Sequence, residues 1–363
     1  MKFVLFSDLH LDATFRWAPS ALARRLRLAQ RETLDNICRL VIEHKADALL
    51  CAGDLYEQES FTPDTAEYLR ATFANLAPTR VFIAPGNHDW CGPSSLYERV
   101  QWSSNVHIFT DSHLIPKQLD DGLRLWGAAH RAPANTDNFL HGFHISDSLS
   151  NIALFHGSER GFFGAQEEGK VAHAAFREYE IPVAGLTHAF VGHFHLPKDS
   201  EWLTYAGSPQ PLAFGTGSGQ AVLIELNGKE TRRTRIDVSA LAFNDITVDV
   251  SGAPSMSEIV ERTRAAVAEL HGVARITLFG SLATTADLKL DDIRRISSDL
   301  EGLVVRSRDV VAAYDLVAFA EEQTVRGQFV RDVQNSNLAS EEKQRVLVVG
   351  LRALDGRADL EPL

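Results

Sequence analysis

Five short apolar runs in the first two hundred residues each end on side chains that commonly bind metal ions. These runs predict strands at 3–6, 48–52, 81–84, 152–155 and 189–191. They are continuous rather than alternating in polarity, which indicates strands buried on both faces in an α/β domain. In such domains, functional sites form beyond the carboxyl ends of the strands. We therefore expect the polar residues after these runs to converge on one site.

The polar residues after the five runs form short motifs. They are Ser7-Asp8-Leu9-His10, Gly53-Asp54 with Glu57 nearby, Gly86-Asn87-His88-Asp89, His156-Gly157-Ser158 and Gly192-His193-Phe194-His195. Side chains two residues apart in an extended chain point the same way, so Asp8 and His10 share a direction. The same holds for His193 and His195. Most of these motifs are weak by themselves, and Gly86-Asn87-His88-Asp89 after an apolar strand is fairly specific, but the five in this order predict a metal site.

Asp54 is the residue expected to touch two metal ions, because a carboxylate can bridge cations about 3.5–4 Å apart. The remaining ligands then divide evenly around it. Asp8, His10 and His195 would hold one ion with Asp54, and Asn87, His156 and His193 would hold the other. The charges of two carboxylates and two divalent ions sum to roughly +2. This local charge would attract a phosphate oxygen, although the chain as a whole carries −12.

The five motifs resemble those of the calcineurin-like metallophosphoesterase superfamily, and the resemblance covers residues 1 to about 230. It implies a four-layer α-β-β-α sandwich, a dinuclear metal centre and the division of ligands given above. It also implies that a metal-bridging hydroxide is the nucleophile and that His88 contacts the scissile phosphate and protonates the leaving group. Mixed His, Asp and Asn ligation suits manganese, iron or zinc better than magnesium. We expect Mn²⁺, with iron and zinc as alternatives.

Three further features resemble SbcD-like DNA repair exonucleases. They are the opening Ser7–Asp12, the segment Tyr205–Pro209 with Phe214-Gly215 and a strand at 221–226, and a small α/β domain followed by a helical tail. The expected domains are a nuclease at 1–235, an α/β cap at 236–325 and a helical tail at 326–363. The resemblance implies cleavage of DNA and docking of the tail on an SbcC-like coiled-coil ATPase. A homodimer is left open.

Glu57 lies three residues after Asp54, where some members of that family, notably archaeal and eukaryotic ones, carry histidine. In the family, this position supplies the partner that orients the catalytic histidine. A carboxylate there favours the imidazolium form of His88, which suits a general acid. The alternative, that Glu57 is a solvated loop residue, stays open. The chain also lacks the Asp-Arg-Gly sequence of protein phosphatases, which disfavours that role.

Composition narrows the class of protein further. The 363 residues, 45% hydrophobic and 23% charged, are typical of a globular chain of about two domains. Three cysteines without a CxxC motif favour a reducing cytoplasm, and no apolar stretch approaches the ~20 residues of a membrane span. Two alternatives to DNA cleavage remain. One is a phosphoesterase for a nucleotide or a lipid-linked pyrophosphate, and the other is a non-catalytic scaffold with a structural metal.

Hydrophobic periodicity predicts the helices. One spans 20–44, and another begins at Thr62-Pro63, which has the sequence of an N-cap followed by the first helical residue. The cap is predicted as β-α-β-α-β, and the tail as one helix. The strands of the cap are expected at 246–250, 274–279 and 303–306, and its helices at 257–270 and 291–300. The tail helix is expected at 340–354.

Several surface features are predicted with less specific signals. Residues 215–219 are expected to form a hairpin turn between 212–214 and 221–224, and residues 326–329 a turn between cap and tail. Arg232, Arg233 and Arg235 are expected to follow a nucleic-acid backbone. For Trp17, which lies near a motif, packing in the core or at its rim is favoured over base stacking.

Overall fold

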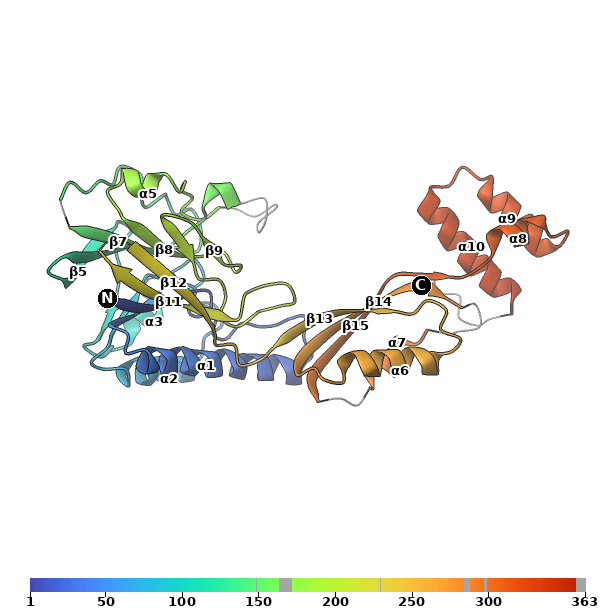
Figure 1. Ribbon diagram of the computed structural model, residues 1–363, viewed down its shortest axis with the longest axis horizontal. Helices are drawn as coiled ribbons and strands as arrows, with labels where there is room; N and C mark the ends of the chain where they lie inside the picture. The colour runs from blue at the N-terminus through green and yellow to red at the C-terminus, as the bar shows by residue number, and fades with distance from the viewer. Residues whose placement is uncertain (148, 163–171, 229, 284–287, 297–298, 357–363) are drawn as a thin grey trace. The chain divides into compact units, whose positions relative to one another are not determined.

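The computed structural model describes residues 1–147, 149–162, 172–228, 230–283, 288–296 and 299–356. The chain divides into two compact units, Met1–Ala242 and Phe243–Leu363 (Figure 1). Each unit has its own hydrophobic core, built where apolar faces of strands and helices meet.

The first sheet of the first unit has six strands in the order β12-β11-β1-β2-β3-β4. Strands β1 to β4 are parallel, and β11 and β12 add an antiparallel edge. Their bounds are β1 Lys2–Phe6, β2 Ala48–Cys51, β3 Arg80–Ile83, β4 Val106–Ile108, β11 Gln220–Asn227 and β12 Glu230–Asp237. Helices α1 (Ser20–Glu43) and α2 (Pro63–Ala74) pack on its outer face. The predicted N-cap is confirmed, because the Thr62 side chain accepts a hydrogen bond from the Thr65 amide.

The second sheet also has six strands, in the order β5-β6-β7-β8-β10-β9. The bounds are β5 Ile115–Asp120, β6 Leu123–Gly127, β7 Ser150–His156, β8 His188–Gly192, β9 Lys198–Asp199 and β10 Leu203–Tyr205. Short helices lie in the loops of this unit: α3 Leu96–Arg99, the 3₁₀ turn Arg160–Phe162, and α5 Glu180–Val183. Strands β6, β7, β8 and β10 are parallel, so the second sheet also has a defined carboxyl edge.

Strand β1 shows why its sequence is apolar throughout. Phe3 and Leu5 lie in the core between the two sheets, whereas Val4 and Phe6 lie in the core beneath α1 and α2. Successive side chains of a strand point to opposite faces, so a strand with a core on each side needs apolar residues at every position. A third core covers the outer face of the second sheet and includes Ile181 of α5. The predicted α-β-β-α sandwich is therefore confirmed.

The second unit contains a parallel three-stranded sheet in the order β13-β14-β15. Its elements are β13 Phe243–Asp249, α6 Met256–Val267, β14 Gly272–Leu282, α7 Leu290–Arg294 and β15 Leu300–Ala312. The predicted β-α-β-α-β order is confirmed, and α6 and α7 pack on one face of the sheet (Figure 1). The helix predicted at 291–300 is too long, because Leu300 already pairs with Gly272 in the sheet.

Three helices follow this sheet: α8 Leu316–Glu321, α9 Val325–Gln334 and α10 Ser340–Leu354. Val330 and Val333 of α9 pack against Leu347 and Leu351 of α10. The predicted turn at 326–329 is wrong, because these residues lie inside α9. The Thr324 side chain accepts a hydrogen bond from an amide in the first turn and so starts the helix there.

One further local prediction fails in the first unit. Strand β11 pairs with β1 and β12 rather than with 212–214, so residues 215–219 belong to a longer loop and not to a hairpin. Arg233 and Arg235 donate to carbonyl oxygens of Ser200 and Ala206, at 2.6 and 3.0 Å. These two guanidinium groups link β12 at the edge of the first sheet to residues beside β9 and β10. The Arg232 side chain is 77% exposed, and contact of the three arginines with nucleic acid stays a prediction.

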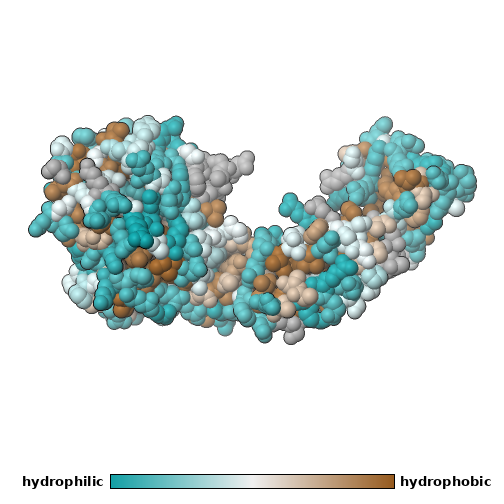
Figure 2. Space-filling model, in the orientation of Figure 1, coloured by the Kyte–Doolittle hydropathy of each residue, from teal (hydrophilic) through white to brown (hydrophobic). Residues whose placement is uncertain are grey.

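The face of the protein shown in Figure 2 is mainly hydrophilic, with scattered hydrophobic patches. Among the described residues, no helix is both long enough and apolar enough to cross a bilayer. The three cysteines are free thiols in buried positions.

Candidate metal centre

The predicted site residues lie at the carboxyl edges of the two sheets, where the sheets meet. Asp8 and His10 follow β1, and His193 follows β8 in the other sheet. The His193 amide donates to the carboxylate of Asp8 at 3.0 Å. His156 ends β7, and its Nδ1 lies 2.8 Å from the carbonyl oxygen of Ala52, just beyond β2. Contacts between the sheets therefore bring motifs far apart in sequence to one place.

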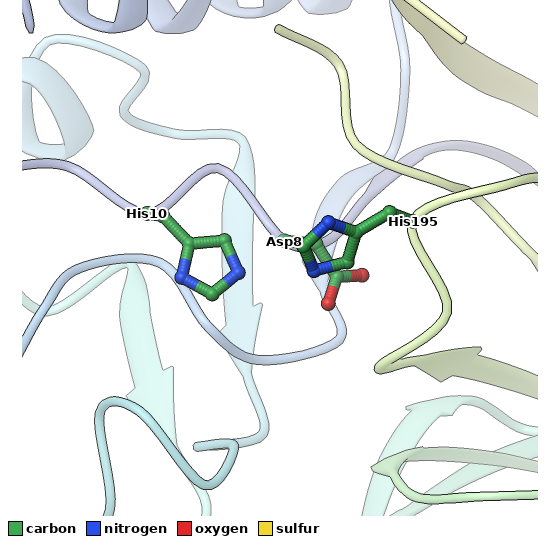
Figure 3. A group of neighbouring side chains, drawn as sticks. All are labelled: Asp8, His10 and His195. Carbon is green, nitrogen blue, oxygen red and sulfur yellow. The ribbon is translucent and has the colours of Figure 1, made fainter. Parts of the chain in front are cut away.

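One group of side chains consists of Asp8, His10 and His195 (Figure 3). Their ligand atoms all lie within 4.8 Å of one another. The loop after β1 supplies Asp8 and His10, and the loop after β8 supplies His195. Asp8 is fully buried and His10 is 2% exposed. A carboxylate and two imidazoles at this spacing could hold one divalent ion.

A second group consists of Asp54, His156 and His193, whose ligand atoms also lie within 4.8 Å of one another. Asn87 joins it, because its Oδ1 lies 3.1 Å from Nε2 of His156. The structure thus gathers the seven predicted ligands into the two groups in which the sequence analysis placed them. What they bind stays a prediction.

Asp54 lies between the two groups. Its Oδ2 is 3.2 Å from Nε2 of His156 and 3.7 Å from Nε2 of His10. Burial would raise the pKa of Asp54, but the imidazoles of His156, His88 and His10 hold it well below its usual range. Burial would likewise lower the pKa of His156, but Asp54 raises it to about 9. The Asp54 carboxylate is thus ionised and placed to contact cations on both sides.

The chemistry of the His10 ring indicates that the site is built for a cation. Within the described part of the chain, Nε2 of this buried ring has no hydrogen-bond partner. A buried polar atom left unsatisfied costs about 1–3 kcal/mol, so such atoms normally have a partner. Here the nitrogen faces the carboxylate of Asp54 at 3.7 Å, a separation too long for a hydrogen bond. The mixed nitrogen and oxygen donors fit a pair of divalent transition-metal ions.

The backbone at the site is strained. Asp8, His10, Asp54 and His193 have φ angles of 55°, 53°, 51° and 109°, in the left-handed region that residues other than glycine rarely adopt. Such conformations cost roughly 1–3 kcal/mol each and cluster at functional sites. Four predicted ligands are therefore held in conformations that the surrounding fold must impose.

Glycines beside the ligands allow the two sheets to approach each other. Gly53 has a φ of 88°, and a Cβ there would lie 2.7 Å from Nδ1 of His156. At Gly192, a Cβ would collide with the carbonyl oxygen of Ala52. Each position directly precedes a predicted ligand, so the glycine permits both the turn and the close contact.

Asp89 organises the backbone around the site, a role that the sequence analysis did not assign to it. Its carboxylate is fully buried and accepts hydrogen bonds from the amides of Asp54, Leu55 and Gly86, at 3.0, 2.8 and 2.6 Å. It also accepts one from the Tyr97 hydroxyl. Asp89 therefore ties the loop after β2 to the loop after β3. Its place in the Gly-Asn-His-Asp motif was the only sequence signal.

Glu57 contacts two histidines with its two oxygens. Oε1 lies 2.7 Å from Nδ1 of His10, and Oε2 lies 3.0 Å from Nδ1 of His88. The Glu57 side chain is 22% exposed, so it is not a solvated loop residue. A carboxylate at Nδ1 keeps the proton on that nitrogen and leaves Nε2 as the atom that each ring offers to a ligand.

His88 and Glu57 form a charged pair beside the metal ligands. Burial would lower the pKa of His88, but Asp54 and Glu57 raise it to about 10. Burial would raise the pKa of Glu57, but its hydrogen bonds to His10 and His88 lower it to about 2. The His88 side chain is 45% exposed, whereas that of His10 is 2% exposed. His88 is thus a protonated, accessible side chain next to a buried site.

Two histidines near the site belong to none of the predicted motifs. His130 is buried, and its Nε2 lies 2.8 Å from the carbonyl oxygen of His156. Burial, followed by the charge of His156, lowers the pKa of His130 to about 3, so this ring is neutral. The His173 ring lies 5.3 Å from the His193 ring. No spacing in the sequence identifies either contact, because each depends on how loops meet.

Residues 1–197 match the family model described as calcineurin-like phosphoesterase. A solved structure from Thermus thermophilus is 15% identical with a TM-score of 0.41, over 64% of this chain and 98% of that protein. A conserved protein of Streptococcus pneumoniae, described as a predicted phosphoesterase, is 11% identical with a TM-score of 0.31. The match covers 65% of this chain and 89% of that protein. An archaeal phosphodiesterase is 13% identical with a TM-score of 0.34. The match covers 65% of this chain and 100% of that protein. The comparison with curated proteins finds no significant match.

Proposed function

The chain belongs to the calcineurin-like phosphoesterase family, and from this premise we propose that it is a metal-dependent phosphodiesterase that cleaves DNA. Phosphoester hydrolysis with divalent metals follows from the family. The choice of DNA, and of an SbcD-like repair nuclease in particular, is the proposal. Its substrate would be a phosphodiester between two nucleosides.

The observation that carries the choice of DNA is the second unit. The resemblance to SbcD-like nucleases predicts a small α/β domain and then helices after the hydrolase domain. The chain has a parallel β-α-β-α-β unit from Phe243 onward, followed by α8, α9 and α10. This order of elements supports the assignment, together with the motifs of the first unit.

In the proposed enzyme, Asp8, His10 and His195 would hold one divalent ion, and Asn87, His156 and His193 would hold the other, with Asp54 as a ligand shared by both groups. When bound, the two ions polarise the phosphoryl oxygens and lower the pKa of water into the neutral range. We propose manganese, with iron and zinc as alternatives.

His88 would supply the proton that the leaving group needs. Glu57 lies at hydrogen-bond distance from Nδ1 of His88, and its negative charge favours the protonated form of the ring. A sugar oxygen is a poor leaving group and departs more easily once it is protonated. General acid catalysis of this kind is typically worth 10²–10⁴-fold in rate.

The experiment that tests this function is an assay of the purified chain with Mn²⁺ on four substrates: single-stranded DNA, duplex DNA, bis-p-nitrophenyl phosphate and free nucleotides. We expect cleavage of DNA and of the small diester, both abolished by a chelator. Hydrolysis of nucleotides without cleavage of DNA would instead indicate a small-molecule phosphoesterase. Absence of hydrolysis with metal bound would indicate a non-catalytic scaffold.

We further propose that the helical end of the second unit docks on an SbcC-like coiled-coil ATPase. Val317 and Val325 are 73% and 75% exposed, and Val346 and Leu354 of α10 are 40% and 46% exposed. Apolar residues this exposed on amphipathic helices are typical of a surface that accepts a partner helix.

A further inference from the structure

Two aromatic rings from distant parts of the sequence lie together at the surface of the first unit. Trp17 is 40% exposed, and its ring centroid is 5.7 Å from that of the half-buried Phe214, with the planes tilted by 59°. The sequence predicts packing of Trp17 in the core or at its rim, but the structure leaves a large part of this residue exposed. An exposed indole is unusual enough to need an explanation, because tryptophan is normally well buried.

The Trp17 ring is held in place. Its Nε1 donates to the carbonyl oxygen of Leu212 at 3.1 Å, so the loop before α1 is tied to the loop between β10 and β11. The Ala18 amide donates to the carbonyl oxygen of Phe15 at 2.9 Å and closes a turn around Trp17. A ring fixed before binding loses little conformational entropy when a ligand stacks on it.

Both loops are joined to the first group of predicted metal ligands. The loop that carries Trp17 leaves the site at His10, whose carbonyl oxygen accepts a hydrogen bond from the Ala13 amide at 3.1 Å. The loop that carries Phe214 begins near Ser208, whose amide donates to the carbonyl oxygen of His195 at 2.9 Å. The aromatic pair therefore belongs to the same edge of the sandwich as the site.

The chain beside the pair carries positive charge. Helix α1 begins at Ser20, no side chain caps it, and its first turn contains no acidic residue. The amino end of a helix carries partial positive charge. Arg16 and Arg24 are exposed on either side of this helix start. Phosphate groups would be attracted to this position.

We propose that Trp17 and Phe214 form a platform on which one unpaired nucleobase of the substrate stacks, with the adjoining phosphates beside Arg16 and Arg24. This inference depends on the proposed action on DNA and names a binding subsite for it. Aromatic rings combined with positive charge are the usual means of holding single-stranded nucleic acid. A base in a duplex already has neighbours on both faces, so the platform selects strands with an unpaired nucleotide.

The test compares two oligonucleotides that carry the same phosphates. Both are fluorescently labelled and linked by phosphorothioates so that they resist cleavage, and one is abasic throughout. Binding to the full chain with Mn²⁺ is measured by anisotropy. We expect Trp17→Ala to weaken binding of the base-bearing strand about tenfold, because stacking on one aromatic ring is worth roughly that factor. Its affinity for the abasic strand should stay within about twofold of the wild type.

Three further variants separate stacking from folding. Trp17→Tyr keeps an aromatic ring and should retain most of the affinity. Trp17→Leu keeps an apolar side chain without a π face and should behave like Trp17→Ala. Tyr179→Ala removes a 59% exposed aromatic side chain just before α5 and should change nothing.

Each outcome supports or overturns the inference. Equal losses on the base-bearing and abasic strands, or full affinity in Trp17→Leu, would show that the aromatic pair only packs two loops. If the wild-type chain cleaves DNA but Trp17→Ala binds both strands normally, the platform is wrong and the proposed function stands. If the wild-type chain neither binds nor cleaves DNA, both fall together.

Discussion

Oε2 of Glu57 lies 3.0 Å from Nδ1 of His88, and Oε1 of the same carboxylate lies 2.7 Å from Nδ1 of His10. One side chain therefore fixes the orientation of a predicted metal ligand and of the proposed general acid. The centroids of the two rings are only 4.7 Å apart. Binding of a cation at His10 and protonation of His88 are thus linked through Glu57.

The first prediction is that Glu57→Gln weakens both functions of this carboxylate. An amide cannot accept hydrogen bonds with both of its atoms, so one imidazole loses its acceptor. We expect metal affinity at the site to fall about 10- to 100-fold, as is typical when a partner of a metal-bound histidine is removed. Metal titration by calorimetry measures this loss. Glu59→Gln, an exposed acid two residues away, is the matched control.

The same variant should change the pH dependence of the reaction. Burial lowers the pKa of His88, whereas the negative charges of Asp54 and Glu57 raise it, and His88 acts only while it is protonated. Loss of the Glu57 charge lowers that pKa, so the proton is lost at a lower pH. The alkaline limb of the kcat profile should therefore move to lower pH. An unchanged limb with normal metal affinity would show that Glu57 has neither role.

The second prediction concerns His88→Ala and the nature of the leaving group. DNA cleavage should fall about 10²–10⁴-fold, because the departing sugar oxygen needs a proton. p-Nitrophenolate leaves without one, so hydrolysis of bis-p-nitrophenyl phosphate should fall much less. Metal content should stay at two ions per chain, since His88 completes neither group. His113→Ala, at an exposed histidine, is the control. Equal losses on both substrates would mean that His88 only positions the phosphate.

The third prediction concerns Asp54, the residue between the two groups. Asp54→Ala should empty or scramble the metal pair and abolish hydrolysis of every substrate, because both ions lose a shared ligand. Elemental analysis of the purified variant measures the metal content directly. Asp64→Ala, at an exposed acid that pairs with Arg31, should leave content and activity unchanged. Near-normal activity with two ions in Asp54→Ala would refute the assignment of the site.

The fourth prediction concerns stability in acid. His188 is buried, and burial followed by the charge of Arg233 lowers its pKa from 6.5 to about 4. Between these values the unfolded chain binds a proton that the folded chain does not, so stability falls as the pH falls from 6.5 towards 4. Between pH 7 and pH 5, titration of His188 lowers the free energy of unfolding by about 2 kcal/mol.

Urea unfolding at pH 7 and pH 5 tests this contribution. His188→Gln cannot titrate and should lose about 2 kcal/mol less than the wild type over that interval. His141→Gln, at an exposed histidine, should lose as much as the wild type. If His188→Gln and the wild type lose equal stability, His188 is already charged in the folded protein.

The fifth prediction concerns the helical end of the chain. The cluster that joins α9 to α10 also includes Tyr314, Leu316 and Phe319, and none of these residues belongs to the core of the β13–β15 sheet. Removal of residues 314–363 should therefore leave the rates with Mn²⁺ on bis-p-nitrophenyl phosphate within about twofold and abolish binding to an SbcC-like ATPase. Loss of the small-diester activity on truncation would place these helices in the structural core of the enzyme.

The sequence predicts the fold well where burial dictates residue type. Phe3 to Phe6 must be apolar at every position because cores lie on both sides of β1, and this pattern is visible without a structure. The helix start at Thr62-Pro63 is equally local, since the cap and the first turn lie within four residues. Local signals fail when another signal competes: the sequence at 326–329 predicts a turn, but the capping side chain of Thr324 starts α9 there.

The candidate site is also predicted only in part, because some of its contacts join residues that are distant in the sequence. Residue type and spacing identify the predicted ligands, because chelation requires particular atoms near strand ends. The double contact of Glu57 and the amide bonds of Asp89 depend on loops that cross between strands, so no spacing encodes them. The pairing of Trp17 with Phe214 joins residues almost two hundred positions apart and likewise needs the folded chain.

The alternation of side chains along β1 has a consequence for how the protein could be monitored. Phe3 and Leu5 occupy one core and Val4 the other, while Asp8 lies two residues beyond the end of the strand. A slip of one residue against β2 would exchange the two sets of side chains and carry Asp8 about 3.3 Å out of place. Helix content would hardly change, but chelation would fail. Uptake of metal is therefore a gauge of correct strand pairing, and it would detect misfolded molecules that circular dichroism counts as native.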